Sequence, residues 1–316
     1  TMQSWMFLSS YEAMREKLLQ YRTIQTMAHL GARAFPEISG EVVQTTAFVM
    51  QGKHLDGFKP VFFRLVDTAQ DSKEIELKAG LNRFDSTVQD DFKKIPGSPV
   101  VYWVSPHIVD LFVSCPQLNE VSDSKVGFMT GDNDKLLRLF WEVNYLKIGF
   151  KYESFNVKRW VPHNKGGGYR KWYGNQEYLV DWTNYANQFN ERYKNYCIQD
   201  SVSWSEITSS NLSFRYFPNG FTFNIKGMCV FSKKYTLSQI LLISNSKVID
   251  FISKAINPTI SFGINNFRSM PALKVEANYA EIQASRLILL SKSDWDSSET
   301  SWDFTQNPII RTGQLN

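Results

Sequence analysis

The first 50 residues alternate between strand-like and helix-like patterns, and this alternation most constrains how the chain can fold. Residues 5–8 are an apolar run that predicts a short buried strand. Ser9 and Glu12 have the spacing of a helix capping box. A helix is predicted from there to about Tyr21, because apolar side chains recur at helical spacing.

Two further apolar runs complete this N-terminal pattern. Residues 24–30 form the first and end at Gly31, and the β-branched residues 42–50 predict a strand. Strand, helix and further strands within 50 residues are typical of the edge of an α/β sheet. Because 50 residues bury too little surface to fold alone, we expect this part to be the distal piece of a larger sheet.

The rest of the chain has a different pattern. Residues 51–125 mix polar turns with one short strand at 61–66, and we interpret residues 56–125 as a connector. From 130 to 231, short alternating runs between glycine, asparagine and proline predict mostly β structure, and a helix is predicted at about 238–255. The predicted division is therefore 1–55, 56–125, a mixed α+β and largely β domain at 126–290, and an acidic tryptophan-containing segment at 291–316.

Charge is distributed unevenly along the chain. The formal net charge of the 316 residues is only +4, so any nucleic-acid footprint must be local. Residues 158–174, hereafter the basic segment, contain five cations and no acid: Lys158, Arg159, Lys165, Arg170 and Lys171. Residues 294–303, hereafter the acidic segment, contain acids and no cation. The basic segment is therefore where we expect a polyanion to bind.

The basic segment also contains aromatic residues and a run of three glycines, Gly166 to Gly168. Glycines let the main chain approach a ligand and expose its N–H groups, and flat side chains pack on bases or sugars. This mixture favours a partner that carries both phosphates and bases. The competing interpretation is a solvated hairpin with a flexible glycine turn.

Other site classes have little support in the sequence. The three cysteines and four histidines are scattered without CxxC spacing, so we expect no metal site, no disulfide framework and reduced thiols in the cytoplasm. No apolar run is long enough for a membrane span, and the start lacks the basic residues of a signal peptide. Asp132 and Asp134 lack the surroundings of a nuclease site. The abrupt start and the trailing end suggest a piece of a longer protein.

Several short motifs, in order, resemble the adenine-specific DNA methyltransferases of BREX phage-defence systems. They include Phe-Leu-Ser-Ser at 7–10, Thr-Thr-Ala-Phe-Val at 45–49, Phe-Lys-Lys-Ile-Pro-Gly-Ser-Pro at 92–99, Thr-Gly-Asp-Asn-Asp at 130–134 and Trp-Val-Pro-His-Asn-Lys-Gly-Gly at 160–167. The resemblance continues to the acidic segment. It implies that residues 1–55 end a catalytic domain, that 126–290 form a target-recognition domain, and that the parent protein methylates adenine with S-adenosylmethionine.

The catalytic motifs of that family are missing from this chain. There is no glycine-rich turn between a strand and a helix to seat S-adenosylmethionine, and Asn257-Pro and Asn307-Pro lack the second proline and the aromatic residue of the adenine-binding loop. We therefore expect no catalytic and no cofactor-binding residue here. The alternative is a non-enzymatic specificity subunit that serves a separate methyltransferase.

Target recognition is the role that remains, with duplex DNA as the expected partner, further phage-defence proteins as a second class of partner, and no membrane contact. Short polar groups and cations on turns and alternating strands are suited to base edges and phosphates. For each candidate, an ordinary Asx turn, a solvated face or a core position competes with the DNA-binding role. The expected DNA contacts are Asp132, Asn133, Lys135, Arg138, Lys158, Arg159, Lys165, Gly166, Gly167, Arg170, Lys171, Trp172, Asn211 and Arg215. Trp295 and Trp302, in the acidic segment, suggest an intramolecular dock or a partner contact.

Overall fold

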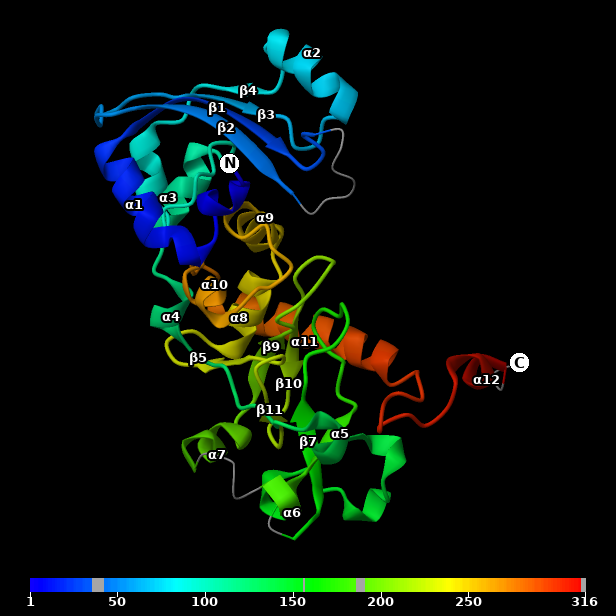
Figure 1. Ribbon diagram of the computed structural model, residues 1–316. Coiled ribbons are helices and arrows are strands. Elements are labelled where there is room, and N and C mark those ends of the chain that lie inside the picture. Colours follow the sequence, from blue (N-terminus) through cyan, green and yellow to red (C-terminus); the bar gives the residue numbers. More distant parts are fainter. Residues whose placement is uncertain (36–42, 156, 186–190, 314–316) are drawn as a thin grey trace. The chain divides into compact units, whose positions relative to one another are not determined.

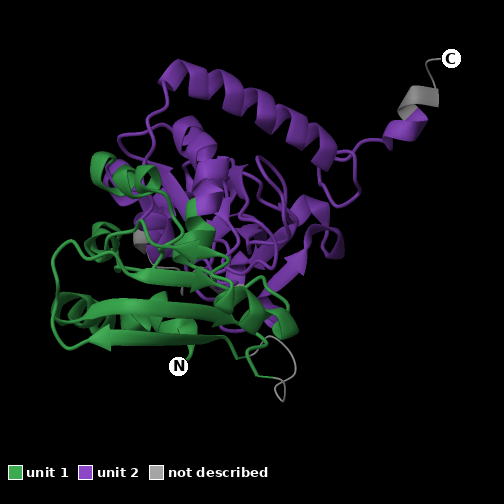
Figure 2. Cartoon of the chain, turned by 90° about the horizontal axis from the view of Figure 1, so that it is seen from above, with its two compact units in different colours: residues 1–115, 252–258 green, residues 116–251, 259–316 purple. Residues whose placement is uncertain are grey.

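The computed structural model describes residues 1–35, 43–155, 157–185 and 191–313, and the chain forms two compact units. Unit 1 comprises Thr1–Cys115 with Ile252–Pro258, and unit 2 comprises Pro116–Phe251 with Thr259–Asn316 (Figure 2). Residues 56–115, interpreted from the sequence as a connector, thus lie in the same unit as the N-terminal strands. No helix among the described residues has the length and apolar character to cross a membrane.

Unit 1 is built on a four-stranded mixed sheet of order β2-β1-β3-β4 (Figure 1). β1 (Thr23–Gly31) is antiparallel to β2 (Thr45–Gln51) and parallel to β3 (Val61–Arg64), and β3 is antiparallel to β4 (Arg83–Phe84). β1, β2 and β3 match the apolar runs of the sequence, although residue 42 of the expected strand lies outside the described residues, and β4 was not expected. With its helices, unit 1 is a mixed α/β structure.

Helical segments at residues 12–21, 89–94 and 106–114 pack against one face of this sheet, and the helix at residues 73–78 lies apart from them (Figure 1). The unit contains α1 (Glu12–Tyr21), α2 (Lys73–Lys78) and α3 (Pro106–Ser114), with the short 3-10 helices η1 (Gln3–Met6), η2 (Ser9–Tyr11), η3 (Gln70–Ser72) and η4 (Gln89–Lys94). Buried side chains from α1, β1, β3, η4 and α3 form one core, for example Leu19, Met27, Phe62, Phe92 and Val109. Removing such apolar surface from water is the main stabilising contribution.

The helix predicted at Glu12 to Tyr21 is confirmed, but the strand predicted at residues 5–8 is wrong, because η1 occupies this segment. The cause is the buried guanidinium of Arg15, whose Nη1 donates to the carbonyls of Trp5 and Leu8 at 2.8 and 3.0 Å. Carbonyls used in this way cannot pair in a strand ladder. The predicted capping box is also absent, since Ser9 lies in η2 and the helix starts without a side-chain cap.

Unit 2 contains two four-stranded sheets, so the described residues form three mostly antiparallel sheets. The first, of order β10-β9-β12-β5, consists of β10 (Phe214–Phe217), β9 (Ser201–Trp204), β12 (Cys229–Ser232) and β5 (Ser122–Lys125). The second, of order β11-β7-β8-β6, consists of β11 (Thr222–Phe223), β7 (Trp160–Asn164), β8 (Tyr178–Asp181) and β6 (Leu137–Leu139). Only the β11–β7 pair is parallel among them.

Short helices connect these strands, and longer ones follow them. They are α4 (Leu118–Val121), α5 (Asn133–Leu136), η5 (Phe140–Glu142), η6 (Tyr145–Lys147), η7 (Tyr152–Ser154), α6 (Trp182–Tyr185), α7 (Glu191–Cys197), α8 (Leu237–Ser244), α9 (Lys247–Ile256), α10 (Ile264–Arg268), α11 (Ala277–Trp295) and α12 (Pro308–Gly313). α9 contains the boundary between the two units. All three cysteines are free thiols.

The helix predicted at 238–255 is two helices in the structure, α8 and α9, and Asn245 lies at the break. Its side-chain amide donates to the carbonyl of Phe214 at 2.8 Å and accepts from the N–H of Phe214 at 3.0 Å. The side chain of Asn245 thus makes hydrogen bonds to the main chain of β10 that a neighbouring strand would otherwise make. Asparagine favours such local backbone bonds over the helix interior, which explains the interruption.

The longest helix, α11, was not predicted from the sequence. Glu276 caps its start by accepting from the N–H of Tyr279 at 2.7 Å. Along its 19 residues only Ala280, Ala284 and Trp295 are buried. Two alanines one turn apart allow close packing of α8, but they do not make the broad apolar stripe by which an amphipathic helix is recognised.

Candidate nucleic-acid interface

The basic segment consists of a buried strand followed by a more exposed loop. Its first half forms β7, in which all five side chains from Trp160 to Asn164 are buried. The exposed part begins after the strand, and Gly167, Gly168 and Tyr169 are all accessible to solvent. The segment is therefore anchored by a central strand, and its polar groups are presented at the ends of that strand.

Two of the five cations are neutralised by carboxylates. Arg159 donates to Asp181 at 2.8 and 3.1 Å, and that carboxylate is only 3% exposed. The ion pair also raises the pKa of Arg159. Arg170 donates to Asp294 of the acidic segment at 3.0 Å. These two charges are available to DNA only in competition with an acid of the same unit.

The other three cations keep their charge uncompensated. Lys158 donates to the carbonyl of Leu146 at 2.7 Å, and Lys171 donates to that of Asn245 at 3.1 Å. The ammonium of Lys165 lies 4.6 Å from the centre of the Tyr178 ring. Carbonyls and rings orient a cation without neutralising it. Within the described chain, these lysines have no carboxylate partner.

The glycines of the segment have a structural role of their own. Gly166 and Gly167 have φ values of +84° and +127°, which side-chain-bearing residues rarely adopt. A Cβ on Gly166 would overlap the carbonyl of Lys226, and one on Gly167 would lie 2.7 Å from the side-chain amide carbon of Asn175. Gly168 has open space in the same test. Tertiary packing alone therefore accounts for the first two glycines.

This packing leaves the amides of Gly167 and Gly168 without a hydrogen-bond partner in the described part of the chain. Their carbonyls, in contrast, are bound by Ser205 at 2.7 Å and by Asn175 at 2.8 Å. Adjacent exposed N–H groups with their carbonyls turned inward make a site that favours anions. A phosphate oxygen has the charge and the size to accept from them.

A buried cation lies under this loop. Arg215 of β10 is completely buried, and its Nη2 donates to the same Ser205 hydroxyl at 2.8 Å. Its Nε and Nη1 have no partner, and no carboxylate pairs with it among the described residues. Burial lowers the pKa of Arg215 to about 10, so it stays charged at neutral pH. An uncompensated buried cation favours negative charge nearby.

The sequence predicted that Arg215 contacts DNA. In this structure its side chain is buried and does not reach the surface, so it cannot touch a base edge. Trp172 is tied to the same strand: its N–H donates to Phe214 at 2.9 Å and its carbonyl accepts from Tyr216 at 2.8 Å. Asn211, four residues before Arg215, is exposed.

The polar turn at 130–138 is ordered by its own side chains. Asp132 caps α5 by accepting from the N–H of Lys135 at 3.0 Å, and Asn133 accepts from the hydroxyl of Thr130. Arg138 donates to two carbonyls, at 2.6 Å each. Asp132, Asn133 and Lys135 nevertheless remain exposed. The Asx-turn interpretation thus describes their backbone role and leaves their outer faces accessible.

The sheet register separates these candidates into two groups. β6 and β7 run parallel on either side of β8, because both are antiparallel to it and Leu137 and Val161 both pair with Val180. α5 therefore leads into β6 at the end of the sheet where residues 158–159 lead into β7. Residues 166–168, the glycine loop, follow the opposite end of β7. The five residues of this strand separate the two ends by about 17 Å. A ligand that meets both groups must be elongated.

The two tryptophans of the acidic segment pack within unit 2. Trp295 is 4% exposed, and Trp302 packs against the rings of Phe140, Phe150 and Phe221. Of the two alternatives drawn from the sequence, the intramolecular dock is the one that the structure shows. Sequence analysis did not identify Ser205 and Asn175, which set the glycine loop, because no local pattern marks them.

Comparison with known proteins decides the kind of protein to which this chain is related. It is 42% identical over 318 residues to the adenine-specific methyltransferase BrxX of Escherichia coli O9:H4 (strain HS), across 98% of this chain. It is 37% identical over 334 residues to the adenine-specific methyltransferase PglX of Lacticaseibacillus casei (strain Zhang), again across 98%. The chain is a relative of these adenine-specific methyltransferases. The resemblance identified in the sequence is confirmed.

The chain spans only about a quarter of these methyltransferases, 26% of BrxX and 28% of PglX. No family model matches the chain. It therefore corresponds to a part of such a methyltransferase.

Two Asn-Pro pairs of the chain share the first two residues of the adenine-binding loop of these methyltransferases. Asn257 directly follows α9, and its N–H donates to the carbonyl of Ser253 at 2.9 Å. Asn307 precedes α12 and accepts from the N–H of Ile309 at 2.9 Å. Both Asn-Pro pairs thus lie at helix ends, where asparagine and proline are common. We assign no catalytic step to them.

Proposed function

We propose that this chain is the part of a site-specific DNA adenine methyltransferase that holds and recognises duplex DNA. The parent protein would act in the cytoplasm in phage defence and use S-adenosylmethionine bound outside this chain. In this proposal residues 1–55 belong to the end of its catalytic domain. Proteins of the same defence system are a second class of partner that the relationship suggests.

One observation carries the DNA-binding part of the proposal. Gly167 and Gly168 are exposed residues whose amides have no partner among the described residues, and Ser205 links the carbonyl of Gly167 to the buried Arg215, which has no carboxylate partner there. Lys165 and Lys171, in the same segment, have no carboxylate partner among the described residues. Donors and positive charge converge on one loop, which supports phosphate binding there.

Each element of the loop has a distinct task in this proposal. The lysines neutralise phosphates, and the glycine amides donate to a phosphate oxygen and set the register of the duplex. Asp132, Asn133 and Lys135, at the other end of the sheet, would meet base edges or the backbone further along the DNA. A methyltransferase must extrude its adenine from the duplex, so a firm grip on the flanking backbone is required.

The test is salt-titrated fluorescence anisotropy with a matched and a scrambled duplex. The variant in which Lys165, Arg170 and Lys171 are all changed to alanine should bind both duplexes more weakly. The slope of log K against log salt should become shallower by about 0.9 for each phosphate that the variant no longer neutralises. Arg170 also packs on Trp295, so its removal can weaken binding through lost packing as well as lost charge. A variant with only Lys165 and Lys171 changed to alanine measures the effect of charge without this packing change.

Lys233, Lys234 and Lys274 provide a matched control, since all three are exposed lysines of unit 2 outside the basic segment. Changing them to alanine removes the same charge and should leave the salt slope nearly unchanged. An unaltered slope in the first triple variant would show that the basic segment is a solvated surface. Variants at Asn133 should instead change which duplex is preferred, by about 1–3 kcal/mol for a good base contact.

The non-enzymatic specificity subunit is the alternative function. The similarity to proteins named as methyltransferases, across 98% of this chain, favours the methyltransferase. The reading frame upstream of residue 1 distinguishes the two, because only the methyltransferase would encode the glycine turn and the Asn-Pro-Pro-aromatic loop.

A further inference from the structure

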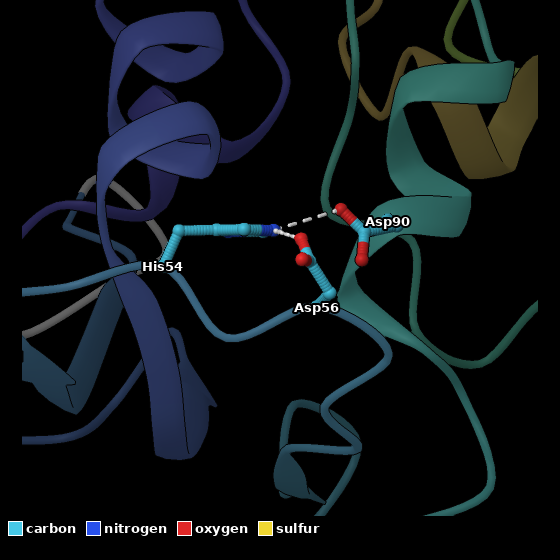
Figure 3. Close-up of side chains that lie close together, drawn as sticks. All are labelled: His54, Asp56 and Asp90. Carbon is cyan, nitrogen blue, oxygen red and sulfur yellow. Dashed lines mark ion pairs between the residues drawn. The ribbon is translucent and has the colours of Figure 1, made fainter.

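A cluster of three metal-binding side chains lies in unit 1, outside the candidate DNA contacts. Nε2 of His54 is 3.2 Å from Oδ1 of Asp56 and 3.2 Å from Oδ1 of Asp90 (Figure 3). One ligand atom from each residue lies within 4.8 Å of the others. His54 and Asp56 follow β2, whereas Asp90 comes from η4, so folding alone brings the three together.

The equal distances are poorly explained by a hydrogen bond. Nε2 carries at most one proton, so a hydrogen bond here would be shared between the two oxygens in a three-centre arrangement, which is weaker than a bond to a single acceptor. Both separations also exceed the 2.7–2.9 Å that is usual for a charge-assisted bond. A metal ion with bonds of about 2.1 Å, in contrast, places neighbouring ligands about 3.2 Å apart when the angle between them is near 100°.

The segment that carries His54 and Asp56 is attached to β1. The hydroxyl of Thr23 donates to the carbonyl of Lys53 and accepts from the N–H of Leu55, both at 2.8 Å. His54 is therefore flanked on both sides by main-chain groups that are tied to the sheet.

The position of Asp90 is set just as firmly. Oδ2 of Asp90 accepts from the N–H of Gly57 at 3.1 Å, which leaves Oδ1 to face His54. The preceding residue, Gln89, is fully buried and accepts from the N–H of Ile24 at 2.8 Å. Its amide donates to the carbonyl of Arg22 at 2.7 Å. These contacts fix the main chain before Asp90 and the orientation of its carboxylate, whereas Nδ1 of His54 has no hydrogen-bond partner among the described residues.

We propose that His54, Asp56 and Asp90 bind a divalent transition-metal ion, with Zn²⁺ as the best match. Imidazole with two carboxylates is a set that zinc accepts, whereas Mg²⁺ and Ca²⁺ prefer oxygen ligands alone. The side chain of His54 is 17% exposed and that of Asp56 fully exposed, so the ion enters from the side of Asp56 and keeps water there. The bound ion would connect the segment after β2 to η4.

Lys93 competes with such an ion. Its ammonium lies 3.0 Å from the same Oδ1 of Asp90 that faces His54. A bound ion would displace this lysine toward solvent, where its 40% exposed side chain has room. If the three residues bind a metal ion, removal of the Lys93 ammonium should therefore strengthen metal binding.

The test is calorimetric titration of the 316-residue chain with ZnCl₂, with Ca²⁺ and Mg²⁺ as contrasts. The expected result is one Zn²⁺ per chain, with binding weakened at least about tenfold in both His54→Gln and Asp90→Asn. His107→Gln is the control, because His107 is an exposed histidine of α3 in the same unit. Zinc should raise the Tm of the wild type and the control, but not that of His54→Gln.

Lys93→Met sharpens the test. Removing the competing cation should strengthen zinc binding by about two- to fivefold, the range expected for removal of an exposed ion pair. The proposal is overturned if the wild type binds no stoichiometric zinc, or if His54→Gln and Asp90→Asn bind it as tightly as the wild type. Equal affinity for Ca²⁺ would overturn the choice of a transition metal.

Discussion

The guanidinium of Arg170 lies over the indole of Trp295, 4.8 Å from the ring centre. The same guanidinium donates to Asp294 at 3.0 Å. One cation of the basic segment is thus held by the acidic segment, 124 residues further along the chain. The acidic segment therefore competes with DNA for this arginine, and the competition can be measured.

Asp294→Asn should strengthen binding to every duplex by about two- to fivefold at low salt, because the charge of Arg170 is then no longer balanced by a carboxylate and is available to phosphates. Anisotropy titrations on matched and scrambled DNA measure the gain. Glu299→Gln removes an exposed acid from the same segment, away from Arg170, and should have a smaller effect. Equal gains in the two variants would mean that only net charge matters.

Gly166→Ala should destabilise unit 2 by at least about 1–3 kcal/mol, the cost of a strained positive φ. The overlap with the Lys226 carbonyl adds to this cost. Gly168→Ala is the internal control, because its Cβ would meet open space. Urea unfolding compares the two free energies, and similar values would show that the loop adapts to a side chain at either position.

Asn245→Ala should destabilise the protein by about 2–4 kcal/mol. It leaves the N–H of Phe214 without its partner in a buried strand, and the Phe214 carbonyl keeps only its bond from the N–H of Trp172. Asn265→Ala, at an exposed position of α10, should change the unfolding free energy little. If both variants unfold at the wild-type urea concentration, Asn245 merely occupies a helix break that forms without it.

Stability should fall with acidification, in part because of His163. This histidine is completely buried beside the hydroxyl of Thr222, and burial lowers its pKa from 6.5 to about 3. Between these values the unfolded chain binds a proton that the folded chain does not, so unfolding becomes easier as the pH falls from about 6.5 toward 3.

His163→Gln removes this proton uptake. Its unfolding free energy should therefore depend less steeply on pH, by up to about 1.4 kcal/mol per pH unit. Urea unfolding at several pH values between 7.5 and 4.5 gives both slopes. Parallel slopes for variant and wild type would show that His163 takes up its proton in the folded state as well.

Local sequence patterns predicted much of the fold and the relationship to adenine-specific methyltransferases. The boundaries of α1 and the strands β1, β2 and β3 follow from residue spacing within short windows. Ordered motifs, none decisive alone, identified the relationship to adenine-specific methyltransferases. Where a distant group intervened, prediction was wrong: Arg15 took the carbonyls of the expected strand at 5–8, and Asn245 interrupted the expected long helix.

The sequence by itself determined that five cations, four aromatic residues and four glycines lie within residues 158–174, because covalent order places them there. The tertiary structure alone decided which of these charges remain free. Arg159 and Arg170 pair with acids 22 and 124 residues away, and the histidine and the two carboxylates of the proposed metal site come from two separate segments. Electrostatic interactions depend on distance in space and on burial, and neither can be read from local spacing.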